Sequence, residues 1–347
     1  IGVDRGLTVG LRSHLSAIKG FGDTITNVNV RLELAQSSLQ RMGEIGREVS
    51  GLLNQATSPD GRATAQIGAK NAVAEMLGLL NTRAGDRYIF SGLASDRAAT
   101  DTIEHILDGD GVKAGLRQVI AERNLADLGA SGLGRLAVSA PTATSVGIAE
   151  DSVSPFGFKL SAIATTIGTA TVTAPVGAPQ SAGIDLGAGN PNAGEAVQLT
   201  LTLPDGSTET LTLTATASAT PGANEFAIGV DSTATAANLQ AALQAALGSA
   251  ARTALSAASA LTAPANFFDA NPPLRVAGPP FDSATGLVAG TPANTVSWYT
   301  GEAGASPART TSTAKVDQSI SVDYGMRANE EAIRWQLQNI ATLAAID

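Results

Sequence analysis

Apolar residues recur at alternating steps of three and four along residues 7–53, and this pattern constrains the fold more than any other feature of the chain. Its members are Leu7, Leu11, Ile18, Phe21, Ile25, Val28, Leu32, Ala35, Leu39, Met42, Val49 and Leu53. Such heptad spacing predicts one long helix with an apolar seam. Gly20 and Gly22 each cost about 1 kcal/mol relative to alanine, so the helix should be most regular over residues 23–56. At 1.5 Å per residue that stretch would measure roughly 50 Å, which is too long to wrap around a compact globule.

Two further helical patterns complete the expected architecture. The turn Ser58-Pro59-Asp60-Gly61 separates the first helix from apolar periodicity over residues 63–80, and helix, short turn, helix predicts an antiparallel hairpin. Residues 326–347 carry a third heptad pattern. Because the seam over residues 25–53 is the only other one of comparable length, we expect the two to pack together. Both chain ends would then form an elongated α-helical bundle or coiled-coil rod.

The interior of the chain is rich in β-strand patterns. We expect short strands near residues 102–107, 135–139, 145–149, 225–230, 296–299 and 314–322, and a helix over residues 113–128. In residues 196–216, leucine and valine alternate with polar residues on either side of Pro204-Asp205-Gly206, which predicts a hairpin. A helix over residues 235–250 should follow and end at Gly248.

Composition shifts at SAIATTIGTATVTAPVGAP, residues 161–179, and we interpret this stretch as a polar linker. The predicted division is therefore residues 1–160 with 271–347 as a helical rod domain with short strands, and residues 161–270 as an inserted variable domain. The fold class is α+β and multidomain, with a small inserted α/β domain beside the rod.

Charge and cysteine content limit the partners. The formal net charge is −9, and lysine and arginine are scattered along the sequence, so neither nucleic acid nor an anionic membrane is expected as a partner. Cysteine is absent, which excludes disulfides and thiolate chemistry. The sequence contains no run of about 18 apolar residues that could span a bilayer. Its first residues also lack the apolar core of a cleaved signal peptide.

Motifs for catalysis or ligand binding are missing as well. The two histidines stand outside any H-E-x-x-H setting, and no Gly-rich phosphate-binding motif occurs. Asp108-Gly109-Asp110-Gly111 lacks the later ligands of a calcium loop and is interpreted as a tight turn. Glu330 and Glu331 fit helix-start charges better than a general acid. We therefore expect no enzyme activity, no cofactor, no metal, and no catalytic, cofactor-binding or metal-binding residues.

Three segments resemble the flagellin family of bacterial flagellar axial proteins. They are LNTRAGDRYIFSGLASD at residues 80–96, VSWYTGE at 296–302 and VDYGMRANEEAIRWQLQNIATLA at 322–344. The resemblance, together with the helical ends, covers about half of the chain, and its first segment favours the hook-filament junction type, a hook-associated protein, over flagellin. It implies a rod of N-terminal and C-terminal helices with a variable insertion. From the resemblance we expect the further amphipathic ends of family members to be missing here, and the chain as given to be monomeric.

The resemblance also implies a function without a reactive site. The chain would be a structural, secreted subunit for motility that self-assembles into a helical axial structure of the bacterial flagellum. It would be extracellular and exported without a cleaved signal peptide. Its partners would be other flagellar axial subunits, including copies of itself, hook-associated proteins and flagellin, and an export chaperone. The residues expected to pack the rod and its assembly contacts are Ile25, Val28, Leu32, Leu39, Met42, Val49, Leu53, Tyr88, Phe90, Ile333, Leu337 and Ile340.

Two other functions stay open from the residues alone. One is a secreted adhesion or glycan-binding surface protein that uses the inserted domain as its binding module. The other is an enzyme, which would need a pocket where titratable groups converge, and the sequence offers no such set.

Overall fold

The computed structural model describes residues 2–346 and shows an α+β protein of two compact units. Unit 1 contains the residues up to 117, residues 271–273 and residues 291–347; unit 2 contains residues 118–270 and 274–290. The sequence-based division placed residues 118–160 with the helical ends, whereas here they pack within unit 2. Within the described range, no helix combines the length and the hydropathy needed to cross a membrane.

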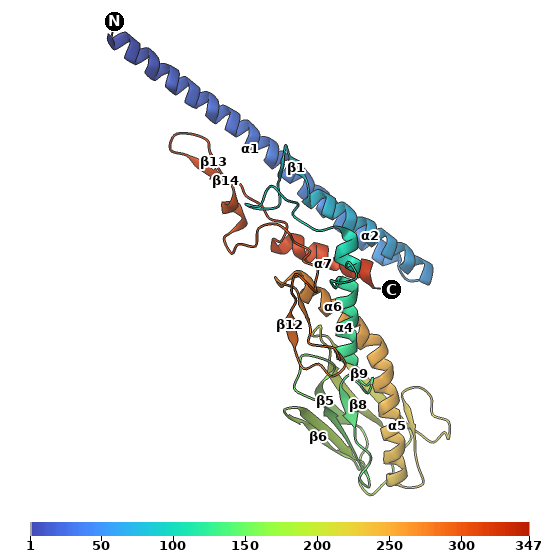
Figure 1. Cartoon of the computed structure of the whole chain (residues 1–347). Coiled ribbons are helices and arrows are strands. Elements are labelled where there is room, and N and C mark those ends of the chain that lie inside the picture. The colour runs from blue at the N-terminus through green and yellow to red at the C-terminus, as the bar shows by residue number, and fades with distance from the viewer. Residues whose placement is uncertain (1, 347) are drawn as a thin grey trace. The chain divides into compact units, whose positions relative to one another are not determined.

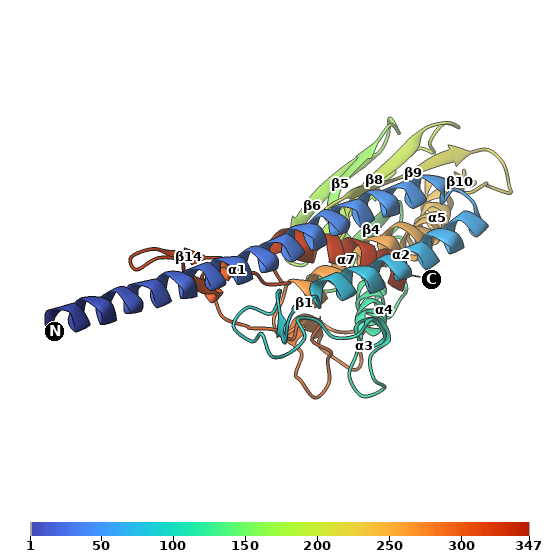
Figure 2. The same ribbon diagram turned by 90° about the horizontal axis from the view of Figure 1, so that it is seen from above.

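Three helices dominate unit 1. They are α1 (Gly2–Gln55), α2 (Pro59–Leu80) and α7 (Glu331–Ala345). α2 packs along α1 and also along α7, and the N-terminal part of α1 extends past both (Figures 1 and 2). The turn between α1 and α2 forms as predicted, because the Ser58 side chain accepts a 3.1 Å hydrogen bond from the Gly61 amide and Pro59 opens the helix. α1 continues without a break through Gly20 and Gly22.

Short elements fill the rest of unit 1. Strands β1 (Arg83–Ala84) and β2 (Arg87–Tyr88) form a tight antiparallel hairpin, and β13 (Thr313–Lys315) pairs with β14 (Ser321–Asp323) in the same way. A 3-10 turn, η2 (Ala308–Thr311), precedes β13.

Two predicted strands of unit 1 are wrong. The strand expected at residues 102–107 is the helix α3 (Ile103–Asp108), because the Thr102 hydroxyl accepts from the His105 amide and caps a helical turn. The strand expected at residues 296–299 is reduced to a single bridge between Thr100 and Tyr299.

Unit 2 holds two four-stranded sheets. One contains β3 (Leu136–Val138), β4 (Ser145–Glu150), β6 (Thr171–Gly177) and β7 (Gln180–Asp185) in the order β3-β4-β7-β6. The other contains β5 (Lys159–Thr165), β8 (Ala196–Thr202), β9 (Thr208–Thr216) and β10 (Glu225–Ala227) in the order β10-β9-β8-β5. The predicted hairpin over residues 196–216 is confirmed as β8 and β9, with Val197 opposite Leu213.

The interpretation of residues 161–179 as a linker is wrong, because this segment supplies most of β5 and all of β6. Ile163 and Ile167 point into the core of unit 2 and are buried. Threonine, valine and isoleucine suit a pleated strand, so a polar composition concealed a strand with one buried face.

Helices cover the sheets of unit 2. α4 (Leu116–Leu128) leads in from unit 1, and α5 (Ser232–Ala250) continues through a π-turn, η1 (Ala251–Leu255), into α6 (Ser256–Phe268). The predicted helix end at Gly248 is therefore wrong, because Gly248 lies buried in the middle of a longer helical run. α5 runs alongside the strands of unit 2 (Figure 1). Leu239, Leu243 and Leu247 of α5 share one core with both sheets. A short hairpin, β11 (Leu274–Val276) and β12 (Leu287–Ala289), closes the unit.

Candidate assembly site

The seam of α1 divides into one buried row and one exposed row. Val28, Ala35, Met42 and Val49 repeat at every seventh position and are all buried. Ser38 and Ile45, which occupy a second heptad position beside this row, are buried as well. The sequence predicted that the second buried position would instead hold Ile25, Leu32, Leu39 and Leu53, which in the structure are 40 to 50% exposed. The helices of unit 1 thus cover only half of the predicted seam.

The exposed row continues toward the N-terminal end of α1. Leu11 and Ile18 lie fourteen and seven residues before Ile25 on the same heptad position and are 57% and 64% exposed. We call Leu11, Ile18, Ile25, Leu32, Leu39 and Leu53 the exposed row. A regular line of large apolar side chains in solvent is typical of a surface that another helix covers.

α7 buries one face and leaves a tryptophan in solvent. Leu337 and Ile340 are buried and Ile333 is half-buried, while Trp335 is 67% exposed. The Gln336 side-chain amide donates to the Met42 carbonyl oxygen and ties α7 to α1. Beside this contact, α1 and α7 border a mainly apolar hollow of about 850 Å³. Its lining includes Gly43, Gly46, Val49, Gly51, Leu53, Trp335, Ile340 and Leu343.

The GDRYIFSGL stretch fastens the two ends of the chain together. Phe90 is buried and Tyr88 half-buried. The Phe90 carbonyl oxygen accepts from the Ala328 amide at 2.8 Å, and Ser91 forms an antiparallel bridge with Arg327. The Ser91 carbonyl oxygen also accepts from the Glu302 amide at 3.0 Å. All three segments that carry the family resemblance therefore meet at one place in unit 1.

A glycine is required at this junction. Gly92 has φ +62°, and a Cβ there would lie 2.5 Å from Glu302 Oε2. That same carboxylate oxygen accepts from the Leu93 amide at 2.9 Å, so its position is fixed. Any larger residue would force the loop away from the segment that follows Tyr299.

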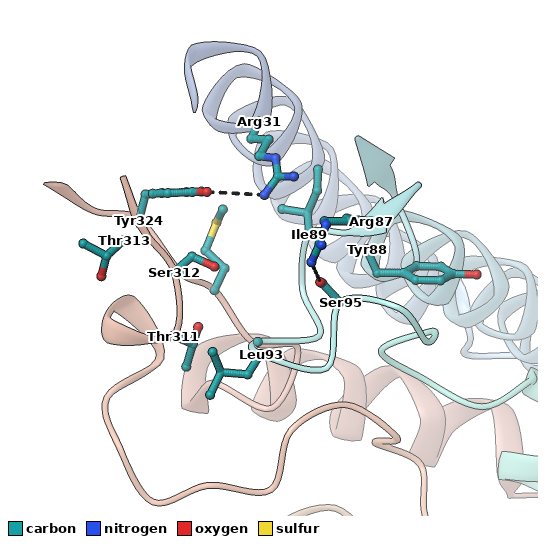
Figure 3. A pocket seen from close by; sticks show the side chains of 13 residues that line it. Arg31, Arg87, Tyr88, Ile89, Leu93, Ser95, Thr311, Ser312, Thr313 and Tyr324 are labelled. Atoms are coloured by element: carbon teal, nitrogen blue, oxygen red, sulfur yellow. Dashed lines mark hydrogen bonds between the residues drawn. The ribbon is translucent and has the colours of Figure 1, made fainter. Parts of the chain in front are cut away.

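Two hollows lie next to this junction and share Arg31, Thr313 and Tyr324. The first, of about 340 Å³, also contains Arg87, Ser95, Leu93 and the Thr311–Ser312 segment, as Figure 3 shows. The second, of about 610 Å³, adds Arg83 and Lys315. We call these two together the basic hollow, because among the described residues its lining includes four cationic side chains and no Asp or Glu.

Two titratable groups of unit 1 have pKa values shifted by their surroundings. Burial raises the pKa of the Tyr299 hydroxyl to about 12. Hydrogen bonds from Arg41 to Glu75, Glu48 and Glu44 raise the pKa of that guanidinium. Among residues 2–346 no group of three or more His, Asp or Glu side chains is placed to hold a metal ion.

None of the protein-family models, curated proteins or solved structures searched matches the chain. The geometry of unit 1 and the resemblance of its three segments therefore carry the functional inference.

Proposed function

We propose that this protein is a structural subunit of the bacterial flagellum, either a flagellin or a hook-filament junction protein, that acts by self-assembly into a helical axial structure. The observation that carries the proposal is the exposed row, in which large apolar side chains recur at seven-residue steps from Leu11 to Leu39 of α1 and again, after Gly46, at Leu53. Each such side chain would contribute about 1.5–3 kcal/mol if a neighbour covered it fully.

In this proposal α1, α2 and α7 form the coiled-coil rod of the subunit. The contacts of Gln336 with Met42 and of Ala328 with Phe90 support it, because they join the two ends of the chain along the rod. Tyr88 and Phe90 hold the turn from helix to strand against this rod. Unit 2 is the variable insertion that the rod carries.

The Leu11–Leu39 part of the exposed row and the hollow beside Trp335 are different surfaces, and Leu53 lies where the row reaches that hollow. A contact in which one copy's row meets a different surface on the next copy is heterologous, and a heterologous contact whose rotation does not close generates a helical tube. Extracellular filament growth requires this geometry. Hook-associated proteins and flagellin would bind the same surfaces at the two ends of the assembly, and an export chaperone would shield the exposed row before export.

An adhesion or glycan-binding role for unit 2 has less support. Sugar-binding sites usually present an aromatic face to the ligand. Phe156, Phe158, Phe226, Phe267 and Phe268 of unit 2 are buried, and Phe281 is half-buried against the cluster around Phe156, so none of them presents a fully exposed ring. Likewise no set of convergent acids and bases favours an enzyme, and we propose neither a cofactor, a nucleic-acid partner nor a membrane partner.

Deletion of the gene in its source bacterium tests the proposal. We expect cells without filaments by electron microscopy, restored by the intact gene, and an epitope-tagged copy located on the flagellum. Counting copies per filament then separates the two types, because a flagellin is present in great excess over a junction protein. Normal filaments in the deletion strain, with the tagged protein elsewhere, would refute the proposal.

A further inference from the structure

The basic hollow gathers positive charge in an acidic chain. The whole sequence has 22 Lys and Arg against 31 Asp and Glu. Arg31 of α1, Arg83 and Arg87 of the β1–β2 hairpin, and Lys315 of β13 nevertheless line two neighbouring hollows that share Arg31, Thr313 and Tyr324. Figure 3 shows Arg31 reaching from α1 toward Tyr324, with Arg87 on the other side of Ile89.

The cations of the hollow are held by weak partners. Arg31 Nη1 donates to the Tyr324 hydroxyl at 3.3 Å, and Arg87 Nη1 donates to the Ser95 hydroxyl at 2.9 Å. Arg83 lies over the Tyr88 ring at 5.1 Å, and its contact with the carboxylate of the fully exposed Asp86 is 3.9 Å long. A guanidinium has five N–H donors in a fork that matches a carboxylate, so most of this donor capacity is directed to neutral groups or left for a ligand.

The acids nearest the hollow are engaged elsewhere. Asp323 accepts a 2.6 Å hydrogen bond from the Thr313 hydroxyl, and Glu302 accepts from the Leu93 amide. Neither belongs to the described lining of the basic hollow. Among the described residues, the contact of Arg83 with the exposed Asp86, 3.9 Å long, is therefore a weak and partial neutralisation of this charge from within the unit.

A complementary patch lies further along the same unit. Glu44, Glu48 and Glu75 all contact Arg41, at 3.3, 2.8 and 2.6 Å, so three carboxylates share one guanidinium. All three acids are at least 38% exposed in their side chains. Arg31 and Glu48 stand on one helix, about 25 Å apart at 1.5 Å per residue, so one copy cannot satisfy both patches itself.

We propose that the basic hollow binds carboxylates of a second copy of this chain, supplied by its Glu44–Glu48–Glu75 cluster. The inference rests on the proposed function and deepens it, because it names the polar contact that sets the register between neighbouring subunits. Two unlike patches that meet head to tail make a heterologous contact, the kind that builds a tube. The apolar contact of the exposed row does not fix the orientation of the two copies. Bidentate pairing of arginine with carboxylate has a defined geometry and would fix that orientation.

Charge exchange tests this contact in the complete gene product under polymerising conditions. We expect Arg87→Glu alone and Glu48→Lys alone each to raise the critical concentration for assembly roughly tenfold or more, since like charges then face each other. The double variant restores opposite charges and should recover most of the loss. Arg252→Glu, an exposed charge reversal in unit 2, should leave assembly unchanged. Far-UV circular dichroism confirms that each variant keeps its helices.

The outcomes separate this inference from the proposed function. If the unaltered protein assembles and the Arg87→Glu variant assembles equally well, this inference is overturned but the proposed function is not. No assembly of the unaltered protein under any condition would overturn the proposed function and the inference with it. Tight binding of a single-stranded DNA oligonucleotide that Arg87→Glu abolishes would overturn the inference in favour of a nucleic-acid site.

Discussion

Arg31 and Tyr324 stand 293 residues apart in the sequence and meet through a 3.3 Å hydrogen bond from Arg31 Nη1 to the Tyr324 hydroxyl. Gln336 and Met42, 294 residues apart, make a second such contact between α7 and α1. Both contacts join the first helix to the last hundred residues of the chain. Unit 1 is therefore built from both chain ends, while unit 2 comes from the middle.

Because one row of the α1 seam is buried and the other is exposed, substitutions to alanine on the two rows should lower the free energy of unfolding by different amounts. Met42→Ala removes a buried side chain and should lower the free energy of unfolding of unit 1 by about 2–5 kcal/mol. Leu39→Ala, three residues earlier on the exposed row, should cost less than about 1 kcal/mol. Urea unfolding followed by tryptophan fluorescence measures both, because Trp298 and Trp335 both lie in unit 1. Equal losses for the two variants would contradict the assignment of rows.

The GDRYIFSGL stretch predicts a second contrast. Phe90→Ala should destabilise unit 1 by about 3–5 kcal/mol, because Phe90 is 1% exposed at the junction of the three segments. Leu93→Ala, close by but 68% exposed, serves as the control and should change stability by about 0.5 kcal/mol or less. The same fluorescence assay applies. A small effect at Phe90 would mean that this stretch does not fasten the chain ends.

Tyr299 predicts a loss of stability at alkaline pH. Burial raises the pKa of its hydroxyl from 10.0 to about 12, so the folded state holds the proton where the unfolded chain releases it. The stability that this group contributes is complete below about pH 10 and is lost as pH rises through about 12. Urea unfolding at increasing pH should therefore show a steeper decline for the unaltered protein than for Tyr299→Phe. Identical slopes would show that Tyr299 titrates normally.

A buried ion pair predicts the behaviour of unit 2. Asp127 Oδ2 accepts from Arg123 Nε and from the Ser259 hydroxyl, each at 2.7 Å, and both charged residues are buried. Asp127→Ala would leave the guanidinium buried without its partner and should cost about 3–5 kcal/mol. Asp205→Ala, in the exposed turn between β8 and β9, should cost about 1 kcal/mol or less. Native-state hydrogen exchange of the β8 and β9 amides reports on both variants, and equal protection would contradict the expected difference.

Local patterns in the sequence predicted the elements well where period and turn chemistry agree. The long helix, the Ser58-Pro59 turn and the β8–β9 hairpin are all confirmed, because heptad spacing, a proline at the first helical position and alternation around Pro-Asp-Gly each act over a few residues. The helix after Thr102 was harder to predict, because a single hydrogen bond to the Thr102 hydroxyl caps it and favours helix over strand. Residues 161–179 were misread because small β-formers resemble a linker in composition.

The candidate site depended on tertiary contacts that no local pattern contains. Heptad spacing gave two rows on α1 but could not tell which row α2 and α7 would bury. The basic hollow could not be predicted from the sequence either. Arg31, the hairpin arginines and Lys315 are far apart in the sequence and converge only when both chain ends pack together.

The central claim is that the exposed row of α1 is an assembly surface, and one comparison tests it most directly. Ile25 and Leu32 lie on the row, while Val9, 68% exposed, lies on another face of the same helix. Electron microscopy and pelleting of the complete gene product should show that Ile25→Ser with Leu32→Ser lowers the yield of polymer roughly tenfold or more, since two apolar contacts are lost. Val9→Ser should assemble normally. Normal polymer yield from the double variant, or equal loss from Val9→Ser, would contradict the claim.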